Sequence, residues 1–484
     1  MTETAARTPS SGRDASWLVG ADLAAVALAF TGQIMLTHAL LAEHYGWMVL
    51  AIDLYASLFL VIDLGLPTLL ARDGTRAPSM VPAAVWRTYR WQAMAALPFV
   101  LLALVARPEA WLNVDGPATL LMLAAMIALV HVASYAPRSG LRVLGEARLE
   151  ALSKVAERGV TVAAYGVLVW QGSTSATAFT AAFLVGALTG WALALWWLLR
   201  VAPPAPERVE WVRLGEAWVS PGSLVMSALP FAITLGILPY VIRIEKFMVA
   251  ASGDATLGAV FHVAQLAWLA GLVVPAAIRS ALLPVIGAAR GHPERHHREM
   301  HQATDLCFGL LPYGLFGGYL IMRFFAPLAF PSSYLDGTYG ASAVDVFTVL
   351  LAGWVLTLLA TPTYTSLMAG PRPWRFTLFI VLVLLAAVLF GYGLVMQGPA
   401  DPGQKLFAAA LASSLSAGVL LVLSWHMSEA WAMVRARKDD WSLALLGSAF
   451  VVVGLVSGTA WWVFGLPLFF FTQRGWRAIR STLD

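Results

Sequence analysis

Apolar runs alternate with short polar segments along the whole chain. The apolar runs recur from end to end and are long enough to cross a bilayer core of roughly 30 Å as helices. The longest polar segments have only about 15 to 20 residues, too few to build a separate hydrophobic core. The pattern predicts fourteen membrane-spanning helices, at 17–41, 47–71, 84–106, 117–141, 148–170, 176–200, 222–250, 256–286, 302–328, 342–368, 376–397, 404–432, 441–457 and 459–473. The last two fit only if the chain turns at Ser457-Gly458-Thr459.

The composition agrees with an all-α, polytopic membrane protein. Of the 484 residues, 59% are hydrophobic and only 12% are charged, whereas soluble domains are about 25% charged. The single cysteine, Cys307, excludes an internal disulfide and a cysteine metal site. No basic block stands alone, so the net charge of +4 does not indicate nucleic-acid binding. Residues 1–15 are polar and are expected to form a disordered cytoplasmic tail, with no cleaved signal peptide.

Basic residues are distributed unevenly between the two sides of the membrane. With the N-terminus in the cytoplasm, the segments on that side hold 26 of the 31 Lys and Arg residues. Cytoplasmic segments of membrane proteins carry such an excess. The distribution therefore predicts an even number of spans, with both termini in the cytoplasm.

Two sequence matches point to an internal repeat. Tyr45-Gly46 and Leu257-Gly258 each lead into a helix, and Gly145 and Gly370 lie in corresponding connections. Repeated halves are typical of transporters, with the substrate site between them near the membrane midplane. We therefore expect two pseudo-symmetric six-helix bundles at 16–201 and 221–432, a cytoplasmic linker at 202–220, and a terminal helix pair with a cytoplasmic tail at 433–484.

Two stretches carry a family resemblance. The first is Ala39–Gly46 (ALLAEHYG), followed by Val61–Pro67 with its Asp-Leu-Gly motif. The second is Ile242–Met248 (IRIEKFM), followed by Leu257-Gly258 and Pro284. Together they resemble the Wzx-type polysaccharide and O-antigen flippases, which belong with MurJ and the MATE exporters to the multidrug/oligosaccharidyl-lipid/polysaccharide (MOP) exporter superfamily. Glu245 stands where that family usually has an Asp, so the charge is kept and the reach is longer.

The resemblance implies an activity and its partners. It implies flipping of a lipid-linked (polyprenyl-pyrophosphate) oligosaccharide across the cytoplasmic membrane by alternating access, for polysaccharide or lipopolysaccharide biosynthesis. Membrane lipids, H+ or Na+, and other polysaccharide-assembly proteins are the further partners that it implies. No cofactor is expected.

Two other classes of function stay open. A cation-coupled multidrug or metabolite exporter of the MATE type would use acidic residues such as Asp22. The two C-terminal helices beyond the six-helix bundles, and the basic residues at the helix ends, favour flipping instead. A membrane enzyme or scaffold is the third class. No Lys follows the glycine spacing of a P-loop, and there is no nucleophile elbow or zinc-protease motif. The outer loops are also short, so the chain is predicted not to be an enzyme.

The richest basic cluster lies at the cytoplasmic ends of the fourth and fifth predicted helices. Arg138 and Arg142 are four residues apart, as are Lys154 and Arg158, so each pair shares a helix face. One interpretation is capture of the substrate's phosphates, which Arg binds with a planar fork. The other is ordinary anchoring to lipid phosphates. Glu150, four residues before Lys154, would mask part of the charge.

A second charged group lies toward the outer end of the seventh predicted helix, where basic residues are scarce. It consists of Arg243, Glu245 and Lys246. Charge within a membrane is costly and usually faces a cavity or a partner. Outer-gate pairing, contact with the substrate headgroup, and a local ion pair at the interface all fit this pattern.

Four further polar residues lie inside apolar runs. Asp22 and Asp53 are, with Glu245, candidates for ion coupling or gating, because an intramembrane carboxylate binds H+ or Na+. His262 and Gln265 share a face of the eighth helix and are candidates for contacting sugar hydroxyls. The alternative for all four is a satisfied hydrogen bond between helices.

The histidine-rich run Gly291–His301 is a weak metal candidate. Its pairs His292/His296 and His297/His301 have helical spacing. No carboxylate or cysteine set completes them, so we expect a solvated loop and no metal site.

Overall fold

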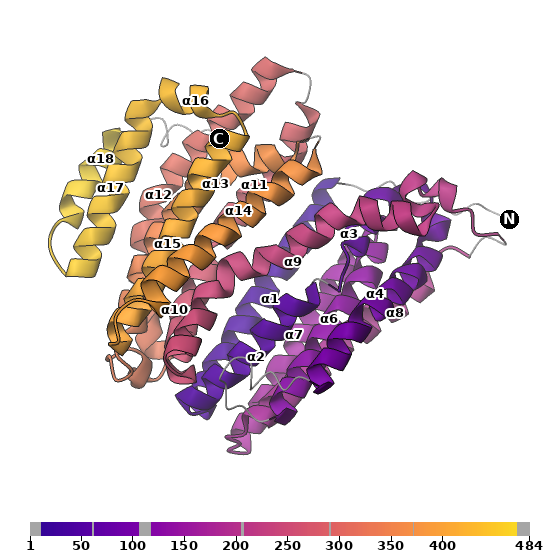
Figure 1. Ribbon diagram of the computed structural model, residues 1–484, viewed down its shortest axis with the longest axis horizontal. Coiled ribbons are helices and arrows are strands. Elements are labelled where there is room, and N and C mark those ends of the chain that lie inside the picture. Colours follow the sequence, from indigo (N-terminus) through magenta and orange to yellow (C-terminus); the bar gives the residue numbers. More distant parts are fainter. Residues whose placement is uncertain are drawn as a thin grey trace. The chain divides into compact units, whose positions relative to one another are not determined.

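The computed structural model describes residues 11–60, 62–105, 118–204, 208–289, 292–370 and 372–471. Within these ranges the regular structure is helical and no strand occurs (Figure 1). Each of the fourteen predicted spans overlaps at least one helix. Nine helices of the described ranges are long and apolar enough to cross a membrane. The prediction of an all-α, polytopic membrane protein is therefore confirmed.

The chain forms two compact units, Met1–Pro239 and Tyr240–Asp484. The division falls inside one continuous helix, α9 (Pro221–Ser252), rather than in the expected linker at 202–220. The other α-helices of the first unit, within the described ranges, are α1 (Ser11–Ala39), α2 (Ala42–Leu60), α3 (Leu66–Asp73), α4 (Val81–Val105), α6 (Ala118–Val143), α7 (Ala147–Trp170) and α8 (Ala176–Val201). Helix α1 thus begins within the stretch expected to be a tail. Helix α7 packs against both α1 and α8, and α6 packs against α8 and α2.

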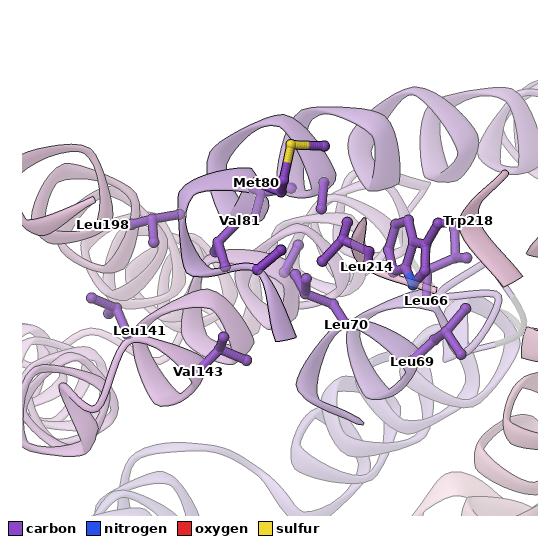
Figure 2. Packing of buried hydrophobic residues seen from close by; sticks show 14 of the residues in the cluster. Leu66, Leu69, Leu70, Met80, Val81, Leu141, Val143, Leu198, Leu214 and Trp218 are labelled. Atoms are coloured by element: carbon purple, nitrogen blue, oxygen red, sulfur yellow. The ribbon is translucent and has the colours of Figure 1, made fainter. Parts of the chain in front are cut away.

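The linker packs against the helices of the first unit, to which it belongs. It forms two short 3₁₀ turns, η3 (Trp211–Arg213) and η4 (Glu216–Trp218). Leu214 and Trp218 are fully buried in a hydrophobic cluster with residues of α3, α4, α6 and α8 (Figure 2). The indole Nε1 of Trp218 donates to Asp73 at 3.2 Å, and Arg87 donates to the Trp218 carbonyl at 2.6 Å. Burial and hydrogen bonds together therefore attach this segment to the ends of α3 and α4.

A left-handed turn interrupts the second predicted span. The sequence predicts one helix at 47–71, and this is wrong, because α2 ends at Leu60 and α3 begins at Leu66. Leu64 and Gly65 both have positive φ, 55° and 65°. The buried carboxylate of Asp63 accepts a hydrogen bond from Gln92 Nε2 at 3.0 Å. The Asp-Leu-Gly motif therefore forms a helix break inside a run that is apolar apart from Asp63.

The second unit is arranged around α13 (Ala343–Met368), which packs against α10, α11, α12, α15 and α17. The eighth predicted span is divided into two helices, since α10 ends at Gly271 and α11 begins at Val273. Trp354 Nε1 of α13 donates to the Gly271 carbonyl at 2.9 Å, which satisfies a group that the helix end leaves open. The helices of this unit are α10 (Ala255–Gly271), α11 (Val273–Ala288), α12 (Pro293–Ala329), α13, α14 (Pro373–Gly391), α15 (Pro402–Met427), α16 (Trp431–Ala436), α17 (Lys438–Ser457) and α18 (Trp462–Phe471).

Two local expectations for the second unit have opposite outcomes. The turn required between the last two spans is present, because Gly458 has a φ of 63° at the end of α17. The solvated loop at Gly291–His301 is wrong, because α12 begins at Pro293 and continues through this run. His296 Nε2 lies 3.0 Å from Ser366 Oγ at the end of α13. Pro293 suits a first helical turn, where no backbone N–H donor is needed.

Candidate functional site

Helix α7 carries a charged stripe in the first unit, which we call the α7 ladder: Glu150, Lys154, Glu157 and Arg158. The spacings of four, seven and eight residues place these side chains along one face of the helix. Glu157 lies ten residues after the start of α7 at Ala147. From Glu150 to Arg158 the ladder covers eight residues, which at 1.5 Å per residue is about 12 Å along the helix.

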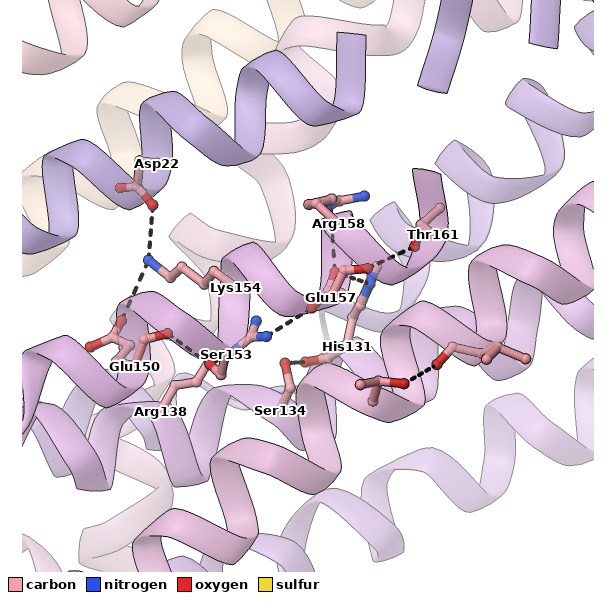
Figure 3. A network of polar contacts seen from close by, with 12 residues as sticks. Asp22, His131, Ser134, Arg138, Glu150, Ser153, Lys154, Glu157, Arg158 and Thr161 are labelled. Atoms are coloured by element: carbon pink, nitrogen blue, oxygen red, sulfur yellow. Dashed lines mark hydrogen bonds and ion pairs between the residues drawn. The ribbon is translucent and has the colours of Figure 1, made fainter. Parts of the chain in front are cut away.

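The deep end of the ladder is centred on Glu157, which is buried (Figure 3). Its Oε2 accepts a hydrogen bond from Arg138 Nη2 of α6 at 2.7 Å. Its Oε1 lies 3.1 Å from His131 Nε2 and 3.7 Å from Arg158 Nη2. The Arg158 guanidinium also lies 5.2 Å from the centre of the Phe183 ring. One buried carboxylate thus organises three nitrogen-bearing side chains from two helices.

The shallow end of the ladder is centred on Glu150, which is also buried. Arg142 of α6 binds both carboxylate oxygens, with Nε 2.9 Å from Oε2 and Nη2 bonded to Oε1. Lys154 Nζ lies 3.4 Å from Glu150 Oε1 and 3.0 Å from Asp22 Oδ1 of α1. Ser153 joins the two ends, because its hydroxyl accepts from Arg138 Nε and donates to the Glu150 carbonyl.

The four predicted cations of this region are therefore brought together, but each is paired with a carboxylate. Four basic side chains face Asp22, Glu150 and Glu157, so the group keeps one positive charge in excess. Sequence reasoning missed Glu157 as the central acid. The seven-residue spacing between Glu150 and Glu157, which places both acids on the helix face of Lys154 and Arg158, was the available signal.

Two glycines of α8 make room for the ladder. An added Cβ at Gly186 would lie 1.9 Å from Thr161 Oγ1, and one at Gly190 would lie 2.7 Å from Glu157 Cβ and 3.0 Å from Arg138 Nη2. Small residues four apart let membrane helices approach closely. The Gly186–Gly190 pair therefore determines how near α8 comes to the ion-paired face of α7.

Replacing Gly190 with alanine is expected to lower the free energy of unfolding by about 1–3 kcal/mol, because a methyl group would overpack the contact with Glu157. Gly159→Ala in α7 is the matched control, since a Cβ there meets nothing within 4 Å. The control should leave stability unchanged or raise it by up to about 1 kcal/mol. Unfolding in detergent, followed by tryptophan fluorescence, measures both. Equal behaviour of the two variants would contradict this packing.

A second polar group lies in the second unit between α9 and α10. Lys246 is fully buried, and its Nζ lies 3.2 Å from His262 Nδ1. Gln265 is buried one helical turn after His262. Glu245 is also fully buried, and within the described ranges neither of its carboxylate oxygens has a hydrogen-bond partner. The structure therefore brings Lys246 and His262 together and leaves the Glu245 carboxylate buried outside this contact.

Two predicted residues lie outside these groups. Asp53 is half-buried on α2 and Arg243 is half-buried on α9, and both take part in polar interactions. Their gating or coupling roles stay predictions. The residues that the structure describes contain no cluster of three or more His, Cys, Asp or Glu side chains placed to hold a metal ion.

Solved structures of other proteins resemble this chain in fold. No protein-family model and no curated protein matches the chain. The inward-facing conformation of a multidrug resistance MATE family transporter of the MOP superfamily matches 84% of this chain and 95% of its own, with 16% identity and a TM-score of 0.62. The outward-facing conformation matches 86% and 96%, with 15% identity and a TM-score of 0.57. A structure of MATE in the straight conformation matches 86% and 95%, with 15% identity and a TM-score of 0.57. The chain has the MATE transporter fold.

Within the MATE fold, the two polar groups occupy different units. The α7 ladder lies in the first unit and the group of Glu245, Lys246 and His262 lies in the second. The superfamily and the Wzx branch that the sequence motifs indicated stay predictions.

Proposed function

We propose that this protein flips a lipid-linked oligosaccharide across the cytoplasmic membrane by alternating access. The α7 ladder is the observation that supports the proposal most directly. Together with Asp22, Arg138 and Arg142 it carries one positive charge in excess, and it extends about 12 Å along α7. A phosphate that enters a medium of low dielectric constant needs such cations, because an unpaired charge there is strongly disfavoured. The Wzx-like motifs are a second, independent support.

The proposal also assigns the chain an orientation in the membrane and gives each of its parts a role. Both termini lie in the cytoplasm, so the shallow end of the ladder faces the cytoplasm, where the lipid-linked substrate is made. The bundles at 16–201 and 221–432 rock against each other, and the terminal pair at 433–484 is an addition to them. No catalytic step is assigned to the protein.

A cation-coupled exporter of the MATE type is the second candidate. The likeness to MATE structures favours it, as does the buried carboxylate of Glu245. Both candidates share alternating access, so the transported molecule distinguishes them.

Translocation in proteoliposomes tests the leading proposal. The assay follows a fluorescent polyprenyl-pyrophosphate oligosaccharide with a membrane-impermeant quencher, under imposed H+ and Na+ gradients. We expect the wild type to move the probe and the double variant Arg142→Gln/Lys154→Gln to be at least about tenfold slower, since each lost charge-assisted bond costs about 1.5–3 kcal/mol. Arg213→Gln, in an exposed ion pair of the linker, is the matched control. Absence of translocation under every gradient, with accumulation of an organic cation instead, would favour the exporter.

Replacing Glu245 with glutamine is expected to abolish the dependence of transport on an ion gradient without loss of stability. A fully buried carboxylate that lacks hydrogen bonds needs a bound proton or cation, whereas the amide of the same shape binds neither. Transport rates with and without imposed H+ and Na+ gradients provide the measurement. Glu210→Gln, at an exposed position of the linker, is the control. A variant that still responds to the gradients would exclude Glu245 as the coupling group.

A further inference from the structure

Lys154 lies between two carboxylates of very different exposure. Its Nζ is 3.0 Å from Asp22 Oδ1 on α1 and 3.4 Å from Glu150 Oε1 on its own helix (Figure 3). The Asp22 side chain is 61% exposed, whereas that of Glu150 is 1% exposed. Another anion can therefore take the place of Asp22 beside Lys154, but it cannot take the place of the buried Glu150.

Glu150 is also held more firmly than Asp22. Both of its carboxylate oxygens are bound by the Arg142 guanidinium in the bidentate arrangement that gives the strongest ion pairs. The Arg142 side chain is itself about half exposed. The Lys154 side chain is 24% exposed. Arg142 and Lys154 are thus two partly exposed cations that share one buried carboxylate, and Asp22 is the exposed partner of Lys154.

The contacts between α1 and α7 differ in kind along α1. Toward its end, Gly32 packs directly against Tyr165, and an added Cβ would lie 3.4 Å from the ring. Toward its start, the contacts are electrostatic: Asp22 with Lys154, and the Arg148 guanidinium 5.3 Å from the centre of the Trp17 ring. Exposed ion pairs are weak and easily exchanged. The start of α1 can therefore separate from α7 while its end stays packed.

We propose that Lys154 and Arg142 form a phosphate-binding site in which Asp22 is a built-in competitor. A phosphate that binds Lys154 displaces the Asp22 carboxylate and frees the start of α1 from α7. A phosphate group carries more charge and more acceptor oxygens than a carboxylate, so it can contact both cations at once. The inference rests on the proposed function only in taking this phosphate to be that of the lipid-linked substrate. Binding of the phosphate is thereby coupled to release of the start of α1 from α7.

If Asp22 competes with phosphate for Lys154, replacing Asp22 and replacing Lys154 should change the affinity for phosphate in opposite directions. Two probes, geranylgeranyl diphosphate and inorganic pyrophosphate, are used. Their binding is measured on the full-length protein in detergent. Asp22→Asn should tighten binding about three- to fivefold, because an exposed competing pair is removed. Lys154→Gln should weaken binding about tenfold or more, and Lys154→Arg should restore it. Glu210→Gln removes a similarly exposed acidic partner elsewhere and should change the affinity less than twofold.

Hydrogen exchange of the α1 backbone is the second readout. In the wild type, added pyrophosphate should accelerate exchange of the amides at 17–30, whereas in Asp22→Asn exchange should already be fast without it. A purely structural role of the Asp22–Lys154 pair would loosen α1 in the variant but would not tighten anion binding.

The outcomes separate this inference from the proposed function. Tighter binding of both probes by Asp22→Asn supports a site for the phosphate itself, and tighter binding of the lipid probe alone supports a site for the lipid-linked form. Unchanged or weaker binding of both probes overturns the competition, even when the wild type flips the oligosaccharide. Tighter pyrophosphate binding in a protein that flips nothing would support the site and refute the flipping function.

Discussion

Replacing Glu157 with alanine is expected to lower the free energy of unfolding by about 3–5 kcal/mol. Arg138, which is largely buried, donates to Glu157 at 2.7 Å, and the variant leaves this guanidinium without its acidic partner. His131 and Arg158 lose the same carboxylate. Removing one member of a buried pair is costly because the remaining charge stays desolvated. Unfolding in detergent micelles, followed by tryptophan fluorescence, measures the loss.

Two further variants determine whether charge imbalance is the cause. The double variant Glu157→Leu/Arg138→Met replaces the pair by apolar side chains of similar size and should recover most of the stability, because such exchanges are often neutral. Glu210→Gln breaks an exposed pair with Arg213 and should cost at most about 1 kcal/mol. If Glu157→Ala were no more harmful than Glu210→Gln, water would have to reach the deep end of the ladder.

The sequence predicts the membrane spans well, because span length depends on the apolar runs alone. It misses helix breaks that lie inside the predicted spans. The break at Leu64-Gly65 follows a single charged residue, Asp63, in a run that is otherwise apolar, and the positive φ of both residues marks it. The break after Gly271 is similar, since its open carbonyl is satisfied by Trp354, a residue 83 positions away in the chain. Tertiary contacts of this kind leave no local signature.

The candidate site was predictable in its cations and in the local pair Glu150–Lys154, but not in the pairs that join different helices. The four-residue spacings identified Arg138, Arg142, Lys154 and Arg158 as two basic faces. Their shared acids became visible only when α6 and α7 were placed side by side, since Arg138 and Glu157 are 19 residues apart. The interpretation of the cluster changes accordingly. The four residues are not a bare basic patch, but a nearly balanced network in which one exposed carboxylate, Asp22, is replaceable.

Replacing Gly65 with alanine is expected to lower the free energy of unfolding by about 2–5 kcal/mol, through two effects that add. Gly65 has a φ of 65°, which costs a residue with a Cβ about 1–2 kcal/mol. An added Cβ would also lie 2.6 Å from the backbone nitrogen of Ala232 and 2.8 Å from the carbonyl oxygen of Ala228 in α9. These are backbone atoms, which cannot rotate away, so α9 would have to shift, and overpacking costs about 1–3 kcal/mol.

Gly172→Ala separates the two effects. Gly172 has nearly the same φ, 70°, but a Cβ there meets nothing within 4 Å. This control should therefore lose only the conformational part, about 1–2 kcal/mol. The difference between the two variants, measured by the same unfolding assay, reports the contact between the Asp-Leu-Gly turn and α9. Equal losses would show that the turn does not restrain α9. A larger loss for Gly65→Ala, together with faster hydrogen exchange at 221–234, would establish that the motif fixes the first part of α9 against α3.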